Sequence, residues 1–183
     1  NMIKLYGGAR SRASIVRLYL EDLAIPYEFI LLDMPAGEHR QPDFLKLNPF
    51  GKVPVIVDGD FTLFESGAIL LYLNQKYDRK DLSIEQQAIL IQWTLFSNAT
   101  LGPGILGEEN REREMPKLMT PLNEILGKQP YILGNEFSVA DVAVGSTLAY
   151  FALLIKPDLS AYPAVVNYIQ LLSNRPACKQ GMS

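Results

Sequence analysis

Cysteine, histidine and tryptophan are scarce in this chain, since each occurs once among 183 residues. The single cysteine, Cys178, excludes an intrachain disulfide, a thiolate zinc cluster and the C-x-x-C pair of redox thioredoxins. With 17 basic and 20 acidic side chains, the chain lacks the basic excess that nucleic-acid binding requires. Apolar runs such as 150–155 are too short to cross a bilayer, and no signal peptide is evident. We therefore expect a protein of the reducing cytoplasm without nucleic-acid or membrane partners.

The first part of the chain alternates between strand and helix patterns. Short β-rich runs occur at 3–6 and 27–32, with helical apolar spacing between them at 13–24. A short helix around 43–47 precedes two apolar runs on either side of Asp58-Gly59, a dipeptide that favours a hairpin turn, and a helical pattern follows at 68–77. This βαβαββα order predicts a thioredoxin-like α/β domain, with helices on both faces of a mixed sheet.

The second part of the chain contains only helical patterns. A charged linker is predicted at 78–82, and Ser83 with Gln86 forms a capping-box signature at the start of the first helix. Gly102-Pro103-Gly104 should break or bend this helix, and a second is expected at 115–126. Ser138 with Asp141 opens a very apolar helix to about residue 155, and a last helix should end near residue 175. We predict domains at 1–77 and 83–183, the second entirely α-helical.

The predicted hairpin carries a set of groups suited to a small peptide. Pro54 cannot donate a ladder hydrogen bond, and a cis Val53-Pro54 bond would leave the backbone N–H and C=O of Val53 open to an extended peptide. Ser66 is the expected N-cap of the following helix, whose positive end attracts a carboxylate. Glu65 beside it offers an acceptor for an ammonium group. The combination suits a peptide that carries both charges.

Together with their flanks, these residues resemble the glutathione-binding motif of the cytosolic glutathione transferases. Segments 37–45 and 48–51 are similar to the phi-class version of this motif. The chain as a whole resembles the bacterial-type transferases and those whose catalytic residue is a serine. The 138–141 box resembles the family's second signature, so the likeness covers nearly the whole chain. It implies a homodimer that conjugates the thiolate of its co-substrate glutathione to small hydrophobic electrophiles in detoxification, with no other cofactor and no metal. The helical domain is short for this family, so we expect the usual C-terminal cover over the acceptor site to be missing.

The resemblance also assigns residues to the two ends of glutathione. Its γ-glutamyl end would be held by Glu65 and Ser66, and its peptide backbone by Val53 next to Pro54. The glycine carboxylate would be held by three basic residues. These residues are His39, Arg40 and Lys52. Arg40 replaces the family's lysine and keeps its charge, and Lys52 stands where glutamine is common in the family. The alternative for these basic residues is an ordinary solvated loop.

Ser11 is the candidate for stabilising the glutathione thiolate. It lies five residues after Tyr6, where the tau and theta classes, which the chain resembles here, carry a catalytic serine. A hydroxyl donor and a helix N-terminus both favour a thiolate. Ser11 can equally do no more than cap the helix, and Arg10 can supply a fixed cation instead. Tyr6 is expected in the core.

The remaining assignments concern the acceptor pocket, the dimer and other functions. An acceptor pocket is predicted from Ala9, Phe96, Leu101 and Ile105, with bundle core as the alternative for the last three. Phe50 is a candidate dimer contact, unless it only packs locally. A non-catalytic glutathione-binding or regulatory protein on the same fold is the alternative function. Thiol–disulfide exchange is disfavoured because no cysteine lies near Ser11.

Overall fold

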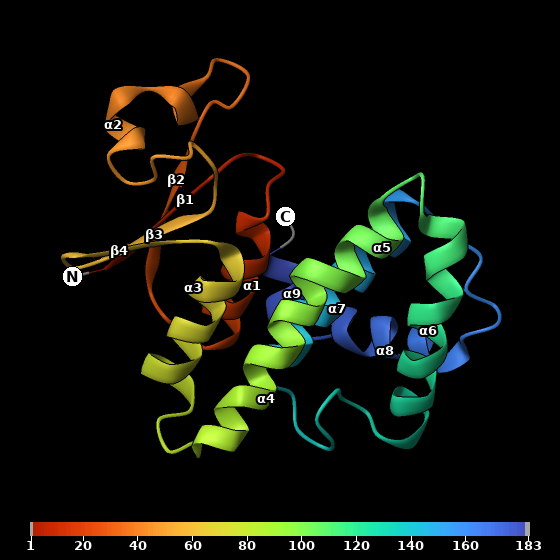
Figure 1. Ribbon diagram of the computed structural model, residues 1–183. Coiled ribbons are helices and arrows are strands. Elements are labelled where there is room, and N and C mark those ends of the chain that lie inside the picture. Colours follow the sequence, from red (N-terminus) through yellow and green to blue (C-terminus); the bar gives the residue numbers. More distant parts are fainter. Residues whose placement is uncertain (1, 182–183) are drawn as a thin grey trace. The chain divides into compact units, whose positions relative to one another are not determined.

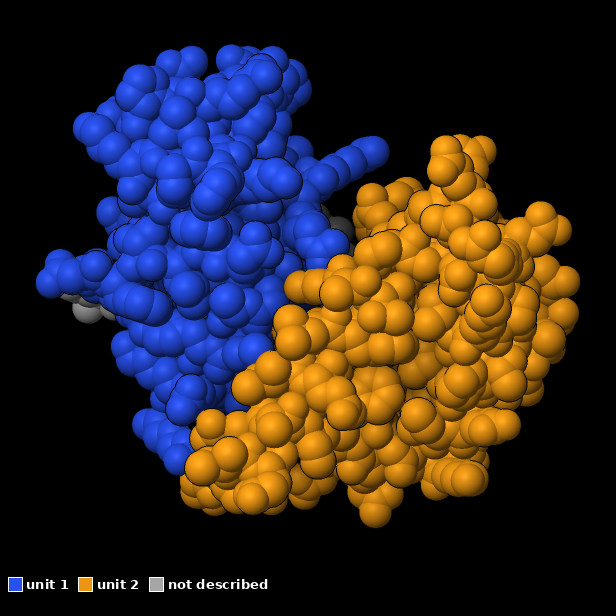
Figure 2. Space-filling model, viewed as in Figure 1, with its two compact units in different colours: residues 1–80, 176–183 blue, residues 81–175 orange. Residues whose placement is uncertain are grey.

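The structure is a computed structural model that describes residues 2–181, and the chain divides into two compact units (Figures 1 and 2). The sheet unit comprises Asn1–Lys80 and Pro176–Ser183, and the helical unit comprises Asp81–Arg175. The division therefore falls inside the predicted linker. The segment from Pro176 onward, which the sequence assigned to the helical domain, groups with the sheet unit instead.

The sheet unit has the predicted βαβαββα order. Its four-stranded sheet has the strand order β2-β1-β3-β4, with β1 parallel to β2 and β3 antiparallel to both β1 and β4. The elements are β1 (Ile3–Gly7), α1 (Ala13–Asp22), β2 (Tyr27–Leu31), the 3₁₀ turn η1 (Glu38–Arg40), α2 (Pro42–Leu45), β3 (Val55–Asp58), β4 (Phe61–Phe64), α3 (Ser66–Leu73) and the π-helical η2 (Asn74–Asp78).

Alternate residues of each strand face opposite sides of the sheet, and both sides are covered. Leu5 is paired with Phe29 and Ile56, and this face packs against α1 and α3, with the Arg17 guanidinium 4.5 Å from the Phe29 ring centre. The opposite face packs against α2. It carries Tyr6, Val55 and Phe64, which cluster with Phe44. Tyr6 is thus a packing residue, as the sequence predicted.

A further helix near the C-terminus was not predicted. The sequence suggested that the last helix ends near residue 175, but α9 (Pro176–Gly181) follows it and packs against α1. Pro176 is compatible with the first position of a helix, because the N–H that it lacks has no helical partner there. Ala177 is buried, and this contact explains why the segment belongs to the sheet unit.

The helical unit is organised around one buried helix, α7. Most residues of α7 are buried, and it packs against α4, η3, α5 and α8. Both predicted capping boxes are present, at Ser83 and at Ser138. The elements are α4 (Ile84–Leu95), the π-helical η3 (Phe96–Leu101), α5 (Gly102–Leu106), α6 (Arg111–Lys128), α7 (Val139–Leu154) and α8 (Pro163–Ser173).

At the predicted break at 102–104 the chain changes from a π-helix to an α-helix. The helix that follows, α6, is longer than expected. The chain passes from α4 through the π-helical η3 into α5, with Pro103 in the first turn of α5. Helix α6 begins at Arg111 rather than near Pro116, because the Arg111 guanidinium donates to the carbonyls of Ile105 and Leu106 and ties the helix start to the end of α5. No helix among the described residues is long and apolar enough to span a membrane.

A cluster of hydrogen bonds fixes the hairpin to the end of α3 and to η2. One carboxylate oxygen of Asp58 accepts from the hydroxyls of Tyr72 and Tyr77 at 2.7 and 2.8 Å, and from Nζ of Lys76 at 2.9 Å. Burial of the Asp58 carboxyl raises its pKa, but these three donors outweigh burial, so the net pKa is lowered. The folded state therefore favours the ionised carboxylate.

We predict that Asp58→Asn lowers the free energy of unfolding by about 1–2 kcal/mol at neutral pH, the scale of losing charge-assisted hydrogen bonds. Because the folded-state pKa is depressed, this contribution is complete above the ordinary aspartate pKa of about 3.9 and is lost as the pH falls through the folded-state value. Urea denaturation of both proteins over a pH series measures the difference. Asp60→Asn, at an exposed position of the same turn, is the control. Equal destabilisation by both variants would contradict the prediction.

Candidate functional site

The sheet topology brings the predicted site residues to one edge of the sheet. Strands β1 and β2 run parallel, so their C-terminal ends lie at the same edge. Strand β3 is antiparallel to β1 and therefore starts there, while β4 ends there; Tyr6, Val55 and Phe64 lie in one row across the three strands. The loop after β1, the loop before β3 and the start of α3 consequently converge at this edge.

The loop before β3 presents the backbone of Val53. The Val53-Pro54 peptide is cis, and the N–H and C=O of Val53 make no hydrogen bond with the described residues. Asn48, 2% exposed, fixes this loop through its side chain: Oδ1 accepts from the N–H of Phe50 at 3.0 Å, and Nδ2 donates to the backbone carbonyl of Lys52 at 2.9 Å. This role of Asn48 was not predicted, although an asparagine before Pro-x-Gly is a signal for such a side-chain turn.

The start of α3 differs by one residue from the prediction. Ser66 is the first helical residue, and Glu65 occupies the cap position that was predicted for Ser66. Glu65 has φ 75° and ψ 116°, a backbone conformation that residues with a side chain rarely adopt. Such an outlier persists only where the surrounding structure enforces it, and it points to a functional position. Glu65 is exposed and directly precedes the first turn of α3, whose N–H groups have no partner within the helix.

The three predicted basic residues come from two segments that touch. A Cβ at Gly51 would lie 3.1 Å from the carbonyl oxygen of His39, so the loop that carries Lys52 packs against η1. Arg40 and Lys52 are exposed, and His39 is half-buried. The Nδ1 atom of His39 is buried and makes no hydrogen bond with the described residues. The arrangement gives one side of the site two exposed cations and an imidazole.

The hydroxyl of Ser11 is held in the loop between β1 and α1. Its Oγ accepts from the N–H of Gly8 at 3.1 Å and from the N–H of Ala13, the first residue of α1, at 3.2 Å. The hydroxyl donates to the carbonyl of Gly8 with Oγ and O 3.4 Å apart, which is long for an O–H···O bond. The Ser11 hydroxyl therefore accepts from the first N–H of α1, although Arg12 occupies the cap position, and the hydrogen bond that this hydroxyl donates is weak. Arg10 is exposed and makes no ion pair with the described residues.

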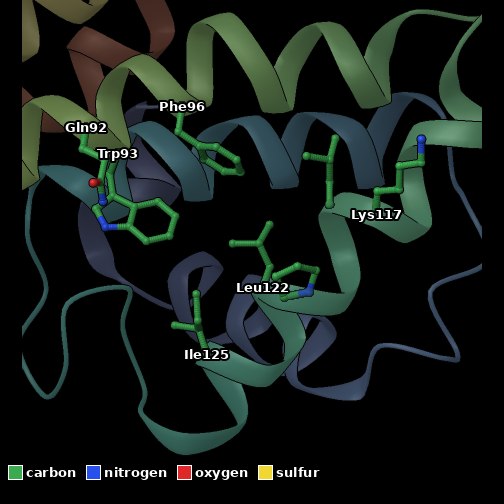
Figure 3. A pocket seen from close by; sticks show the side chains of 8 residues that line it. Gln92, Trp93, Phe96, Lys117, Leu122 and Ile125 are labelled. Carbon is green, nitrogen blue, oxygen red and sulfur yellow. The ribbon is translucent and has the colours of Figure 1, made fainter.

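The residues predicted to line the acceptor pocket differ in how deeply they are buried. Leu101 and Ile105 are completely buried, so they belong to the packed core, the alternative stated above, and do not form an open pocket wall. Leu101 and Ile105 lie on either side of the Gly102-Pro103-Gly104 segment, and the local sequence does not reveal which side of the helix faces the core. Phe96 is half-buried and lines a cavity within the helical unit (Figure 3). Ala9 is exposed in the sheet unit.

Phe50, the candidate dimer contact, lies largely exposed on the loop before β3. Phe50 is 72% exposed and contacts Phe64 edge to face, with ring centres 5.8 Å apart. It packs locally and still exposes most of its ring, so its dimer role stays a prediction. Among the described residues no cluster of three or more His, Cys, Asp or Glu side chains can hold a metal ion.

Comparison with known proteins places this geometry in a family. Residues 1–75 match the model of the glutathione S-transferase N-terminal domain, and residues 108–171 match that of the C-terminal domain. The chain belongs to the glutathione S-transferase family. Among curated relatives, glutathione S-transferase hmp2 of Hypomyces subiculosus is 36% identical over 167 residues, covering 77% of this chain and 78% of the relative.

Two further similarities bear on function. The disulfide-bond oxidoreductase YfcG of Escherichia coli is 32% identical over 206 residues, covering 99% of this chain and 94% of YfcG. The crystal structure of glutathione transferase URE2P6 from Phanerochaete chrysosporium, in complex with oxidized glutathione, matches with a TM-score of 0.87 and 26% identity, covering 98% of this chain and 94% of that chain. The glutathione transferase fold predicted from the sequence is therefore confirmed.

The backbone of Glu65 gives a stability prediction. Glycine adopts a positive φ without a steric penalty, whereas alanine keeps the strain. We expect Glu65→Gly to be more stable than Glu65→Ala by about 1 kcal/mol, although both variants remove the carboxylate. Urea denaturation of the two variants measures this difference. If the alanine variant is as stable as the glycine variant, the cap position carries no strain.

Proposed function

We propose that this protein binds glutathione at the edge of the sheet unit and transfers it to small hydrophobic electrophiles, as in detoxification. The observation that carries the proposal is that Ser11, Val53 and the Glu65–Ser66 helix start converge at one edge of the sheet. The loop that carries Lys52 leads into Val53 and packs against the turn that carries His39. An extended tripeptide has a charged end, a peptide backbone, a thiol and a second charged end. The site offers a complementary group for both charged ends, for the peptide backbone and for the thiol of such a tripeptide.

Each part of the site has a distinct role in binding. The N–H and C=O of Val53 pair with the backbone of the tripeptide as an added strand. The first turn of α3 at Ser66 binds the γ-glutamyl carboxylate, and Glu65 accepts from its ammonium group. The glycine carboxylate lies towards the basic side of the site, formed by His39, Arg40 and Lys52. This polarity places the sulfur near the loop that carries Ser11.

The chemical step requires ionisation of the bound thiol. A free thiol has a pKa of about 8.5, and lowering it by about two units requires about 2.7 kcal/mol of differential stabilisation. Two N–H donors occupy the Oγ of Ser11, so its weakly held proton is available to the sulfur. The thiolate attacks an electrophilic carbon; with an aryl halide, a sulfur–carbon bond forms, the carbon–halogen bond breaks, halide leaves and the thiol proton passes to solvent.

Thiol–disulfide exchange is the second candidate function, and the similarity to YfcG over nearly the whole chain favours it. The absence of a cysteine near Ser11 does not exclude it, because glutathione itself can supply both thiols. A bound thiolate attacks a small disulfide and releases one thiol; a second glutathione then attacks the mixed disulfide and releases the other. Two glutathione molecules are oxidised to the disulfide while the substrate is reduced to two thiols.

Assays with several substrates separate these functions. We expect turnover of a chromogenic aryl halide or an isothiocyanate above the uncatalysed rate. Turnover of hydroxyethyl disulfide without turnover of any electrophile would favour the second function. Glutathione binding without turnover of either class would indicate the non-catalytic binding or regulatory protein. Absence of glutathione binding would refute all three.

We predict that Glu65→Gln and Ser66→Ala raise the glutathione KM with little change in kcat. Both residues contact the γ-glutamyl end, which lies away from the reacting sulfur, so their interactions are equally strong before and during reaction. Each loss should be about 1–3 kcal/mol, the scale of a charge-assisted hydrogen bond. Steady-state kinetics at varied glutathione measures both constants. A collapsed kcat at unchanged KM would show that the tripeptide is bound in the reverse direction.

We predict that Ser11→Ala raises the pKa of the bound glutathione thiol and lowers kcat/KM ten-fold or more, equivalent to at least about 1.4 kcal/mol. The measurement is thiolate ultraviolet absorbance of enzyme-bound glutathione against pH, in the wild type and in Ser11→Ala. Ser14→Ala, at the exposed second residue of α1, is the control, and denaturation measures any stability lost with the hydrogen bonds that Ser11 accepts from Gly8 and Ala13. An unshifted titration in Ser11→Ala with a raised one in Arg10→Ala would assign the role to Arg10.

We predict a homodimer of the cytoplasm in which Phe50 contacts the partner subunit. The Phe50 ring, 72% exposed on a short loop, offers apolar surface whose burial against a second chain would be favourable. Sedimentation equilibrium at micromolar concentration should give twice the 20.5 kDa chain mass, and Phe50→Ala should weaken association. A wild-type monomer would refute the dimer, and an unchanged dimer in Phe50→Ala would refute only the contact.

A further inference from the structure

The sheet unit has an open depression at the edge opposite the proposed glutathione site. It lies where α1 ends and β2 begins, whereas Ser11 and Val53 lie at the other edge, where β1 ends and β3 begins. Its volume is about 470 Å³. The last turns of α1, the connecting turn 24–26 and the first residues of β2 line it, so it is complete within the sheet unit.

Two opposite charges line this depression without pairing directly. Arg17 and Glu21 lie one turn apart on α1, a spacing at which a direct ion pair is common. Instead, the Tyr27 hydroxyl bridges them: its oxygen accepts from Nε of Arg17 at 2.9 Å, and it donates to Oε1 of Glu21 at 2.7 Å. Neither Arg17 nor Glu21 forms an ion pair with the described residues. Burial of the Tyr27 phenol, together with its bond to Glu21, raises its pKa, so the bridge stays protonated.

The bridge leaves both charged groups with unused hydrogen-bonding capacity. A guanidinium carries five N–H donors, and only the Nε–H of Arg17 has a hydrogen-bond partner among the described residues. The Arg17 guanidinium lies over the Phe29 ring, which holds its position. Oε2 of Glu21 also makes no hydrogen bond with the described residues. The depression therefore presents fixed cationic donors close to an anionic acceptor.

The rest of the lining is an apolar turn with a fixed shape. The N–H of Ile25 donates to the carbonyl of Leu20 at 3.0 Å, and the N–H of Ala24 donates to that of Glu21 at 3.1 Å. These two bonds close the end of α1 in the Schellman pattern, with Ala24 in the left-handed conformation at φ 54°. Pro26 restricts the backbone further. Ala24 and Pro26 are exposed and Ile25 is half-buried, so the turn offers apolar surface in a depression that also carries the two charges.

We propose that this depression binds a free α-amino acid with an apolar side chain. The terminal N–H groups of Arg17 hold the carboxylate, Glu21 accepts from the ammonium group, and the side chain lies against the turn 24–26. Glu21 would repel a simple anion, and Arg17 would repel a simple cation. A ligand that carries both charges on neighbouring atoms satisfies both groups at once. The site uses no residue of the proposed glutathione site and does not depend on it.

The experiment is an NMR titration of the full ¹⁵N-labelled chain with leucine. The Nε–H signal of Arg17, identified by its loss in Arg17→Lys, and the backbone amides of Ile25 and Tyr27 report on the depression. We expect saturable shifts of these signals with a Kd of about 1 mM, a range that a ligand of roughly nine heavy atoms reaches. Isocaproate lacks the ammonium group of leucine and isoamylamine lacks its carboxylate, and each should bind about five-fold more weakly, the upper scale for one exposed charge pair.

A variant of Glu21 separates the role of its charge from a structural role. Glu21→Gln keeps an acceptor oxygen for the Tyr27 hydroxyl but removes the charge. It should therefore weaken leucine binding about five-fold without weakening isocaproate binding. Glu28→Gln is the matched control, because Glu28 is exposed on the opposite face of β2, and it should leave the leucine affinity unchanged. Circular dichroism of each variant checks that the fold persists.

Four outcomes would overturn the proposal. The first is the absence of saturable shifts at the three reporter signals, and the second is equal affinity for leucine and isocaproate. The third is an equal loss of both ligands in Glu21→Gln, which would make Glu21 a structural residue. The fourth is loss of leucine binding at saturating glutathione. The γ-glutamyl end of glutathione carries the same pair of charges, so this outcome would make glutathione the occupant in place of a free amino acid.

Discussion

The candidate site depends on the pairing of β1 with two neighbours of opposite direction. Because β1 is parallel to β2 and antiparallel to β3, the loop after β1 and the loop before β3 must lie at the same edge of the sheet. The Asp58-Gly59 turn then returns β4 to that edge, where α3 begins. A shift of one residue in this register would turn the row of Tyr6 and Val55 to the other face and remove the packing against α2.

The site itself is made mostly of backbone groups and helix ends. Val53 offers its main chain, and Ser66 begins a helix. Ser11 accepts from the N–H of Gly8 in the loop after β1 and from the first N–H of α1. Such groups need little reorganisation when charge develops on a ligand, so a modest number of fixed dipoles can stabilise a thiolate. The strained backbone at Glu65 and the buried Asn48 show where the fold holds these groups in place.

The sequence predicted the element order of the sheet unit, because this order follows from hydrophobic period and turn chemistry; the roles of the site residues came from the family resemblance and stay predictions. The Asp58-Gly59 hairpin and both capping boxes depend on local residues and are confirmed. Two helix boundaries were wrong because they depend on tertiary contacts: α6 starts early because Arg111 bonds to the end of α5, and α9 exists through packing on α1. The burial of Leu101 agrees with the core alternative, which local sequence could not separate from a pocket wall. Glu65 as the cap residue was missed because local pattern favours serine there.

The central claim is that the sheet edge binds glutathione and ionises its thiol in one step. Calorimetric titration with glutathione, in two buffers of different ionisation enthalpy, measures affinity and proton release together. If the thiol pKa falls from about 8.5 to about 6.5, binding at a pH of about 7.5 should release about 0.8 proton per site. Binding without proton release would leave a glutathione-binding protein that does not activate the thiol. No heat of binding would contradict the account of the site altogether.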